Sequence, residues 1–352
     1  RFRHKFGVRP DVNTQWPDAR IYAHLTTESC TLYIDTSGEP LFKRGWRADK
    51  GDAPLKETLA AAMLAASGWS QGDGTAANPD GLVAQGVPLY DPCCGSGTIA
   101  IEAAQIACNI APGSMRKFGF QKLIPYQEHV WHGLLDNARA QECEPRAEVF
   151  GSDVAFRMVD FAQRNAERGG VAHAVQLRGG DALQRMPPSD VPGVMLVNPP
   201  YGERIEAAGI AGAARRARYS PPTEYVSPYE DVNQNGDAGF DDEAHGGGNS
   251  NGMLRDDVPR FGARDIAQTE DGGDFFAQLA SHWKKNYAGW TAWMLTPDLK
   301  LPSRMRFKES RRVPMWNGPI ECRMFRFDLR AGSMRNKPND AQPTEGNGPA
   351  QP

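Results

Sequence analysis

The chain has 352 residues, 40% of them hydrophobic, and a net charge of −3, enough apolar content to bury a substantial core in one large domain or two. It contains no run of about 18 apolar residues and no signal-peptide pattern, which argues against a membrane-spanning or exported protein. None of its six cysteines forms two Cys-x-x-Cys pairs at zinc spacing, and so we expect no metal site and a reduced, cytoplasmic protein.

The N-terminal region contains two predicted strands, at residues 20–25 and 31–35, and Ser37-Gly38-Glu39-Pro40 supplies a turn after the second. Two strands alone do not make a stable domain. The chain also begins at Arg1 in the middle of a pattern. We therefore expect this region to be the last part of a truncated module.

Basic and aromatic residues alternate just after these strands, at Arg44, Trp46 and Arg47. Positive charge beside aromatic rings suits contact with RNA. The alternative is a solvated face with one packed tryptophan.

A helix is predicted to open near Asp52, which can cap it, with Pro54 in its first turn. Its apolar face would consist of Leu55, Leu59, Met63 and Ala66. Gly68 would end the helix. Lys56 and Glu57, close to its start, are the polar side chains able to reach a ligand. Residues 69–86 are predicted to be a loop that can vary without penalty.

A strand, a glycine turn and a helix follow over residues 87–104. Glycines let the backbone approach a ligand closely and leave N–H groups at the helix start. A phosphate-binding P-loop would need Gly-Lys-Ser/Thr, which is absent. A dinucleotide site would need an acidic residue about 20 positions on, where residues 112–122 offer Arg and Lys instead. The run Asp91-Pro92-Cys93-Cys94-Gly95-Ser96-Gly97-Thr98 resembles motif I of S-adenosylmethionine-dependent methyltransferases that act on exocyclic nitrogens.

Two further acidic residues follow predicted strands. A second amphipathic helix, over roughly 127–141, precedes the strand 147–153, which ends at Asp153. This carboxylate can accept hydrogen bonds from both ribose hydroxyls; alternatively, Asp153 caps the helix at 155–168. Asp181 follows the strand 174–177, where an acid commonly receives the adenine amino group in the methyltransferase fold.

The motif Asn198-Pro199-Pro200-Tyr201 follows a short apolar strand at 191–197. Two prolines end the strand, and ligands bind at the carboxyl ends of strands in open α/β sheets. The Asn198 side chain and the Pro199 carbonyl form a pair of acceptors for an exocyclic NH2, while Tyr201 can stack on the ring. The stretch resembles the amino-methyltransferase motif Asn/Asp-Pro-Pro-Tyr; a proline-terminated strand with a surface tyrosine is the alternative.

The composition changes after Arg204. Residues 219–262 are dominated by Gly, Asp, Asn, Ser and Pro, which predicts a flexible acidic insertion rather than a metal site. A helix is predicted from Asp274 to Trp283, a buried strand over 289–295 and a final strand pair that includes 322–327. The segment before that pair is strongly basic and offers RNA contacts at Arg304, Arg306, Arg311 and Arg312. The tail 333–352 is predicted to be disordered.

Together these motifs resemble the guanine-N2 rRNA methyltransferase family whose type member acts on the large ribosomal subunit. The resemblance covers about residues 18–330 and includes Ala53-Pro-Leu-Lys-Glu, Asn198-Pro-Pro-Tyr-Gly-Glu-Arg and Trp316-Asn-Gly-Pro-Ile-Glu-Cys. It implies an α/β, Rossmann-like class I methyltransferase domain at 46–330, preceded at 1–45 by the C-terminal part of a THUMP RNA-binding module.

The resemblance also implies a division of labour among the predicted site residues. S-adenosylmethionine would be bound by Lys56, Glu57, Asp91, Pro92, Cys93, Gly95, Ser96, Gly97, Thr98, Asp153, Asp181 and Asn198. Asn198, Pro199, Pro200 and Tyr201 would hold the target guanine of 23S rRNA, as naked RNA or in a large-subunit particle. Arg204 would join the basic residues as an RNA contact.

Other activities share the Asn-Pro-Pro-Tyr motif. DNA adenine-N6, tRNA guanine-N2 and protein glutamine-N5 methyltransferases all modify a planar NH2. The DNA enzyme predicts a target-recognition domain that neither the tail nor the insertion resembles, and a protein substrate does not account for the basic segments. A non-catalytic RNA-binding assembly factor that has kept the fold is the alternative outside enzymes.

Overall fold

The computed structural model describes residues 2–13, 17–51, 54–72, 74–199 and 275–330. The predicted insertion 219–262, the tail 333–352 and the residues Pro200, Tyr201 and Arg204 lie outside these ranges. The helices and strands after the N-terminal region are α2 (Glu57–Ala66), β3 (Leu89–Asp91), α3 (Thr98–Ala107), α4 (Glu128–Ala140), β4 (Val149–Asp153), α5 (Phe156–Arg168), β5 (Val175–Gly179), β6 (Val194–Val197), α8 (Phe275–Asn286), β7 (Thr291–Thr296), α9 (Leu301–Arg304), β8 (Arg311–Asn317) and β9 (Ile320–Asp328).

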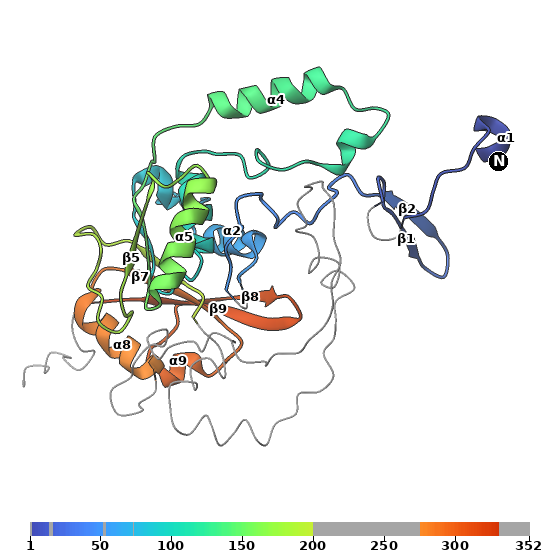
Figure 1. The fold of residues 1–352 in the computed structure, drawn as a ribbon. Helices are drawn as coiled ribbons and strands as arrows, with labels where there is room; N and C mark the ends of the chain where they lie inside the picture. The colour runs from blue at the N-terminus through green and yellow to red at the C-terminus, as the bar shows by residue number, and fades with distance from the viewer. Residues whose placement is uncertain (1, 14–16, 52–53, 73, 200–274, 331–352) are drawn as a thin grey trace, which may run out of the picture.

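A seven-stranded sheet forms the centre of the molecule, in the order β5-β4-β3-β6-β7-β9-β8. The first five strands are parallel, and β9 and β8 are antiparallel additions at one edge. Residues of α2, α3 and α5 pack on one face of the sheet, and residues of α8 and α9 pack on the other. The result is a three-layer α/β arrangement (Figure 1), as the sequence predicted.

The N-terminal region contains a short helix, α1 (Phe2–Phe6), and a hairpin of β1 (Ile21–Leu25) and β2 (Cys30–Ile34). Every residue of both strands is exposed, so the hairpin has no core of its own. It is tied to the larger body after β2, where the N–H of Phe120 donates to the carbonyl of Thr36 at 2.9 Å. Figure 1 shows the hairpin to one side of the sheet, with α4 set apart along the top.

The predicted helix near residue 52 begins later than expected. Its first residue is Glu57, and Lys56 has an extended backbone, so the prediction that Asp52 caps the helix is wrong. Leu55 lies before the helix and is buried, and the buried apolar residues of α2 are Ala60, Met63 and Leu64. The apolar face therefore starts one turn later than the sequence pattern indicated.

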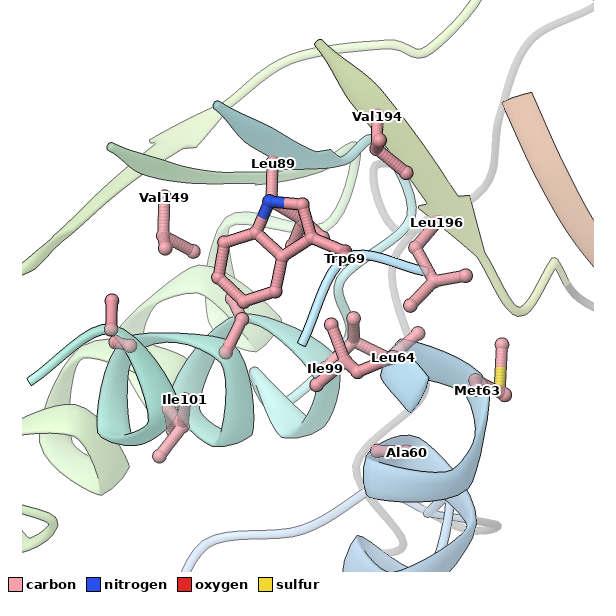
Figure 2. Close-up of a cluster of buried hydrophobic side chains, with 14 of the residues drawn as sticks. Ala60, Met63, Leu64, Trp69, Leu89, Ile99, Ile101, Val149, Val194 and Leu196 are labelled. Atoms are coloured by element: carbon pink, nitrogen blue, oxygen red, sulfur yellow. The ribbon is translucent and has the colours of Figure 1, made fainter. Parts of the chain in front are cut away.

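The stretch 69–86 contributes to the core, contrary to the prediction of a freely variable loop. Trp69 is fully buried, and its Nε1 donates to the carbonyl of Val87 at 2.8 Å. Figure 2 shows its ring between the sheet residue Leu89 and the helix residue Ile99. A short 3-10 helix at Leu82–Gln85 completes the stretch. Among the described helices, none has the length and apolar character needed to cross a membrane.

Candidate cofactor and substrate site

Three acidic residues lie near the carboxyl ends of adjacent parallel strands. Asp91 ends β3, Asp153 ends β4, and Asp181 follows the end of β5 by two residues. The strand register pairs Asp91 with Gly151 and Asp153 with Gly179. The fold thus brings three of the predicted cofactor residues to one edge of the sheet, where open α/β sheets bind ligands.

Asp91 is almost completely buried, with 1% of its surface exposed. Its Oδ1 accepts a hydrogen bond from the N–H of Cys93 at 3.1 Å. Burial raises the pKa of this carboxyl to about 8, and the negative charge of Asp153 adds to the effect. Within the described ranges, no Lys, Arg or His forms an ion pair with Asp91. A cationic ligand at this edge would supply the missing positive charge.

The glycine turn joins β3 to α3 and is bonded to the end of β4. The N–H of Gly95 donates to Oδ2 of Asp153 at 2.9 Å. A Cβ built on Gly95, whose φ is +53°, would meet nothing within 4 Å, whereas one built on Gly97 would lie 2.9 Å from the Cβ of Ala162 in α5. Gly95 therefore faces open space, and Gly97 allows the turn to pack against the helix.

Asp153 does not cap the following helix. The N-cap of α5 is Ala155, and Oδ1 of Asp153 accepts a hydrogen bond from its N–H at 3.0 Å. The alternative interpretation of Asp153 as an N-cap is therefore wrong. Its carboxylate instead fixes the position of the glycine turn relative to β4.

Phe156 is a residue of this edge that sequence analysis missed. It is the first residue of α5, and its ring contacts the backbone of Gly179 at the end of β5. The residue is 71% exposed although its side chain is large and apolar. An aromatic residue three positions after an acidic strand end was the available signal, but in the sequence it is indistinguishable from the start of an amphipathic helix.

Asn198 follows β6, the strand on the other side of β3. The register pairs Tyr90 with Met195. The chain runs from β3 outward through β4 and β5, then crosses back to β6, so the β3/β6 boundary is the topological switch point of the sheet. Asn198 is half-buried and Pro199 is buried. Asn198 and Asp91 thus follow neighbouring strands at the same edge.

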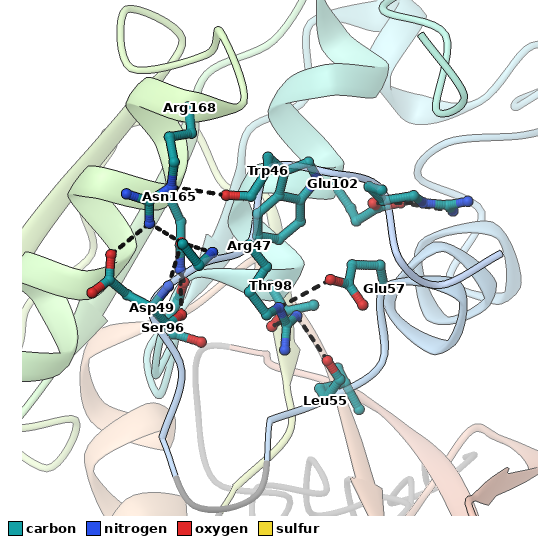
Figure 3. A network of polar contacts seen from close by, with 12 residues as sticks. Trp46, Arg47, Asp49, Leu55, Glu57, Ser96, Thr98, Glu102, Asn165 and Arg168 are labelled. Carbon is teal, nitrogen blue, oxygen red and sulfur yellow. Dashed lines mark hydrogen bonds and ion pairs between the residues drawn. The ribbon is translucent and has the colours of Figure 1, made fainter. Parts of the chain in front are cut away.

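A polar network ties residues 44–49 to α2, α3 and α5 (Figure 3). Arg47 forms an ion pair with Glu57 at 3.0 Å, and its Nη2 donates to Oγ1 of Thr98 at 2.6 Å. Arg44 pairs with Glu102 through Nε at 3.1 Å. The side chains of Arg44 and Arg47 are only 12% and 11% exposed.

These contacts correct the predicted RNA contacts in this segment. Trp46 is fully buried, so its ring cannot stack on a nucleotide at the surface. The tryptophan is packed, as the alternative predicted, but Arg44 and Arg47 do not form the solvated face that the alternative also predicted. The guanidinium groups of Arg44 and Arg47 form ion pairs with buried glutamates of the protein itself. We name residues 44–49 the linker strap, because they connect the hairpin region to the start of α3.

Glu57 is likewise occupied by the strap. It is 3% exposed, and burial raises the pKa of its carboxyl while the Arg47 charge opposes that rise. Lys56 is half-buried, with its Nζ 5.1 Å from the ring centre of Phe42. Glu57 therefore contacts Arg47, and Arg47 in turn donates to Thr98, the residue that follows the glycine turn.

The basic residues near the C-terminus are on the surface. Arg304, Arg306, Arg311 and Arg312 are all exposed. Arg304 pairs with Asp298 at 2.9 Å and Arg312 with Glu309 at 2.6 Å. Exposed pairs of this kind are weak and exchange readily with other anions.

A hollow of about 440 Å³ lies on the α8 face of the sheet, lined by residues that include Tyr90, Phe150, Arg178 and Arg185. It does not include the acidic strand ends. Across the described ranges, no group of three or more His, Cys, Asp or Glu residues could hold a metal ion.

Two parts of the chain match known protein families. Residues 44–213 match the family model described as the RMKL-like methyltransferase domain, and residues 1–35 match the THUMP domain. Curated relatives include the ribosomal RNA large subunit methyltransferase K/L of Psychromonas ingrahamii, 32% identical over 92% of this chain, and that of Shewanella amazonensis, 33% identical over 95%. The chain spans only 34% and 37% of the length of these two relatives.

Solved structures agree on the fold. The structure of SMU.472, described as a putative methyltransferase complexed with SAH, is 24% identical, with a TM-score of 0.62 over 94% of this chain and 68% of the other. A structure described as a possible methylase, from Clostridium difficile 630, is 22% identical with the same TM-score over 95% and 68%. At these identities the likeness concerns the fold alone. The two family models and the curated relatives identify residues 44–213 as an RMKL-like methyltransferase domain and residues 1–35 as a THUMP segment ahead of it.

Proposed function

We propose that this chain transfers the methyl group of S-adenosylmethionine to the exocyclic N2 of a guanosine in 23S rRNA. The observation that carries the proposal is the neighbourhood of Asp91 and Asn198 at the topological switch point. The end of β3, with Asp91, is suited to a cationic cofactor, and the end of β6, with Asn198, is suited to a planar NH2 group. The name of the curated relatives, ribosomal RNA large subunit methyltransferase K/L, supports ribosomal RNA as the substrate.

The residues at the sheet edge fit S-adenosylmethionine in charge and shape. The buried Asp91 carboxyl complements a cation. Asp153 is an acceptor for ribose hydroxyls and Asp181 for the adenine amino group, while the exposed Phe156 side chain lies against Gly179, the register partner of Asp153, and offers a face for the adenine. Gly95 leaves room for close approach. The rest of the turn, which contains Pro92, Cys93, Ser96, Gly97 and Thr98, shapes this cradle, with Lys56 and Glu57 behind it.

Bound S-adenosylmethionine supplies a methyl carbon that is already electrophilic, so the protein's task is alignment. The Asn198 side-chain oxygen and the Pro199 carbonyl accept hydrogen bonds from the two N2 hydrogens and so orient the nitrogen lone pair. Tyr201 stacks on the guanine, a contact worth roughly 1–3 kcal/mol. Pro200 belongs to the same motif, and its ring fixes φ.

The RNA must present an unstacked guanine to this edge. Flipping a base out of a helix costs on the order of a few kcal/mol, which contacts from Arg204, Arg304, Arg306, Arg311 and Arg312 would offset together with the THUMP segment. We place the reaction in the cytoplasm, with 23S rRNA or a large-subunit particle as partner; all six cysteines are free, in keeping with a reducing compartment.

The product nucleoside tests the proposal. The chain is incubated with radiolabelled S-adenosylmethionine and large-subunit rRNA from a strain lacking this activity, and the labelled nucleoside is identified. We expect N2-methylguanosine. Labelled N6-methyladenosine would overturn the assigned target, and label on protein rather than RNA would overturn the substrate class.

A further inference from the structure

One tryptophan lies on the surface of the β8–β9 hairpin. Trp46, Trp69, Trp283, Trp290 and Trp293 are at most 2% exposed. Trp131 packs against Phe118 and Phe120. Trp316, by contrast, is 59% exposed. A large amphipathic ring held at the surface by a rigid strand is a typical contact residue.

The strand register places Trp316 beyond the edge that carries Asn198. Val197 pairs with Met294, Met294 with Phe325, and Phe325 with Arg312, so these residues form one row across the sheet. Asn198 lies one residue beyond this row and Trp316 four residues beyond it. Trp316 therefore lies on the order of 10 Å further out than Asn198, and three strand spacings, roughly 14 Å, to the side. This separation is too great for both residues to hold one base.

The surface around Trp316 carries more positive than negative charge, although Glu321 lies directly opposite Trp316 in the strand register. Arg312, Pro314 and Trp316 alternate along β8 and share one face, and Arg323 of β9 lies opposite Pro314. Residues 300–330 contain nine basic and three acidic side chains, in a chain whose net charge is −3. Arg312 and Arg323 pair with Glu309 and Glu321 at the surface, and such pairs exchange readily for phosphates.

We give the name β8 strip to Arg312, Pro314 and Trp316 of β8 together with Arg323 of β9. We propose that the β8 strip binds single-stranded RNA next to the target guanosine. The Trp316 ring stacks on a flanking base, and Arg312 and Arg323 contact the adjoining phosphates. Aromatic rings on a sheet surface with neighbouring cations are a recurrent way of holding unpaired nucleotides. The choice of RNA as the ligand rests on the proposed function, but the binding itself requires neither cofactor nor methyl transfer.

The test measures RNA binding without cofactor. A labelled single-stranded RNA oligonucleotide of mixed sequence is titrated with the whole chain and with Trp316→Ala, Trp316→Phe and Leu134→Ala. Stacking contributes roughly 1–3 kcal/mol per base, so we expect Trp316→Ala to weaken binding roughly 5- to 150-fold. Trp316→Phe should retain most of the affinity. Leu134 is an equally exposed apolar residue on α4, 56% exposed, and its variant should bind like the parent.

Tryptophan fluorescence supplies an independent readout. RNA should quench emission of the parent chain, and Trp316→Phe should lose most of this response while keeping its affinity. RNA affinity unchanged in Trp316→Ala would overturn the inference, as would self-association that the parent shows and this variant loses, which would mark a protein interface. If Trp316→Ala loses RNA affinity but the parent chain yields no methylated nucleoside, the proposed function is refuted. RNA binding by the β8 strip is then still supported.

Discussion

Asp91 illustrates how burial prepares a single side chain for a ligand. Its folded pKa is about 8, against an ordinary value of 3.8. Between these two values the folded chain keeps a proton that the unfolded chain has lost. The stability contributed by this group is therefore fully present below the ordinary pKa and declines as pH rises toward 8.

We predict that replacing Asp91 removes this decline. The melting temperature of the cofactor-free chain should fall from about pH 6 to about pH 8, and Asp91→Asn should fall less over the same range because its amide does not titrate. Thermal melts at matched ionic strength measure the difference. Asp190→Asn, a change at an exposed carboxylate, should behave like the parent. Parallel curves for Asp91→Asn and the parent would mean that the Asp91 carboxyl is ionised throughout.

Single residues also mark where sequence reasoning reaches its limit. The spacing of Asp91, Asp153 and Asn198 after apolar runs could be predicted, because a buried strand followed by a polar residue is a local pattern. The burial of Trp46 and the exposure of Phe156 could not, because both depend on which distant element covers the side chain. A tryptophan between two arginines has the same local appearance in a core and on an RNA-binding surface.

Among the elements, the helices α4, α5 and α8 begin within one residue of their predicted starts, and the strands β3, β4 and β6 end at the predicted residues. The start of α2 is the exception. The helix α2 begins later than Asp52 and Pro54 indicated: the backbone of Lys56 is extended, and the carbonyl of Leu55 accepts a hydrogen bond from Nη2 of Arg47 at 2.9 Å. Contacts of this kind leave no local signal in the sequence.

The linker strap gives a prediction at the scale of elements. Arg47 joins the strap to α2 through Glu57 and to α3 through Thr98. Removing one partner of a buried ion pair leaves an uncompensated charge, so Arg47→Ala should lower the free energy of unfolding by about 3–5 kcal/mol. The double variant Arg47→Ala, Glu57→Gln should recover part of that loss, because the stranded carboxylate is gone.

Denaturant unfolding of these variants measures the effect. The control is Arg139→Ala on α4, whose ion pair with Asp136 is exposed and should contribute at most about 1 kcal/mol. If Arg47→Ala changes the free energy of unfolding as little as the control does, the predicted stabilising role of the linker strap is contradicted. So would a double variant less stable than Arg47→Ala alone.

At the scale of the whole molecule, the order of strands decides the site. Neither Asp91 nor Asn198 is informative about the other in the sequence, since more than 100 residues separate them. The crossover from β5 to β6 makes them neighbours. The resemblance to a family supplied that arrangement in advance, whereas composition and periodicity could not. The same strand order places the basic β8–β9 hairpin to the side of the switch point. Although the net charge of the chain is −3, positive side chains are therefore concentrated where the proposed RNA would bind.

The most direct test of the account is to separate turnover from cofactor affinity in Asn198→Ala. We predict that the rate of guanosine methylation falls by about 100-fold or more, because misalignment of the acceptor nitrogen alone costs that much. The dissociation constant for S-adenosylmethionine, measured by calorimetry on the same preparation, should stay close to that of the parent. A variant that methylates at the parent rate, or that loses turnover and cofactor affinity in equal measure, would contradict the assignment of Asn198 to the target base.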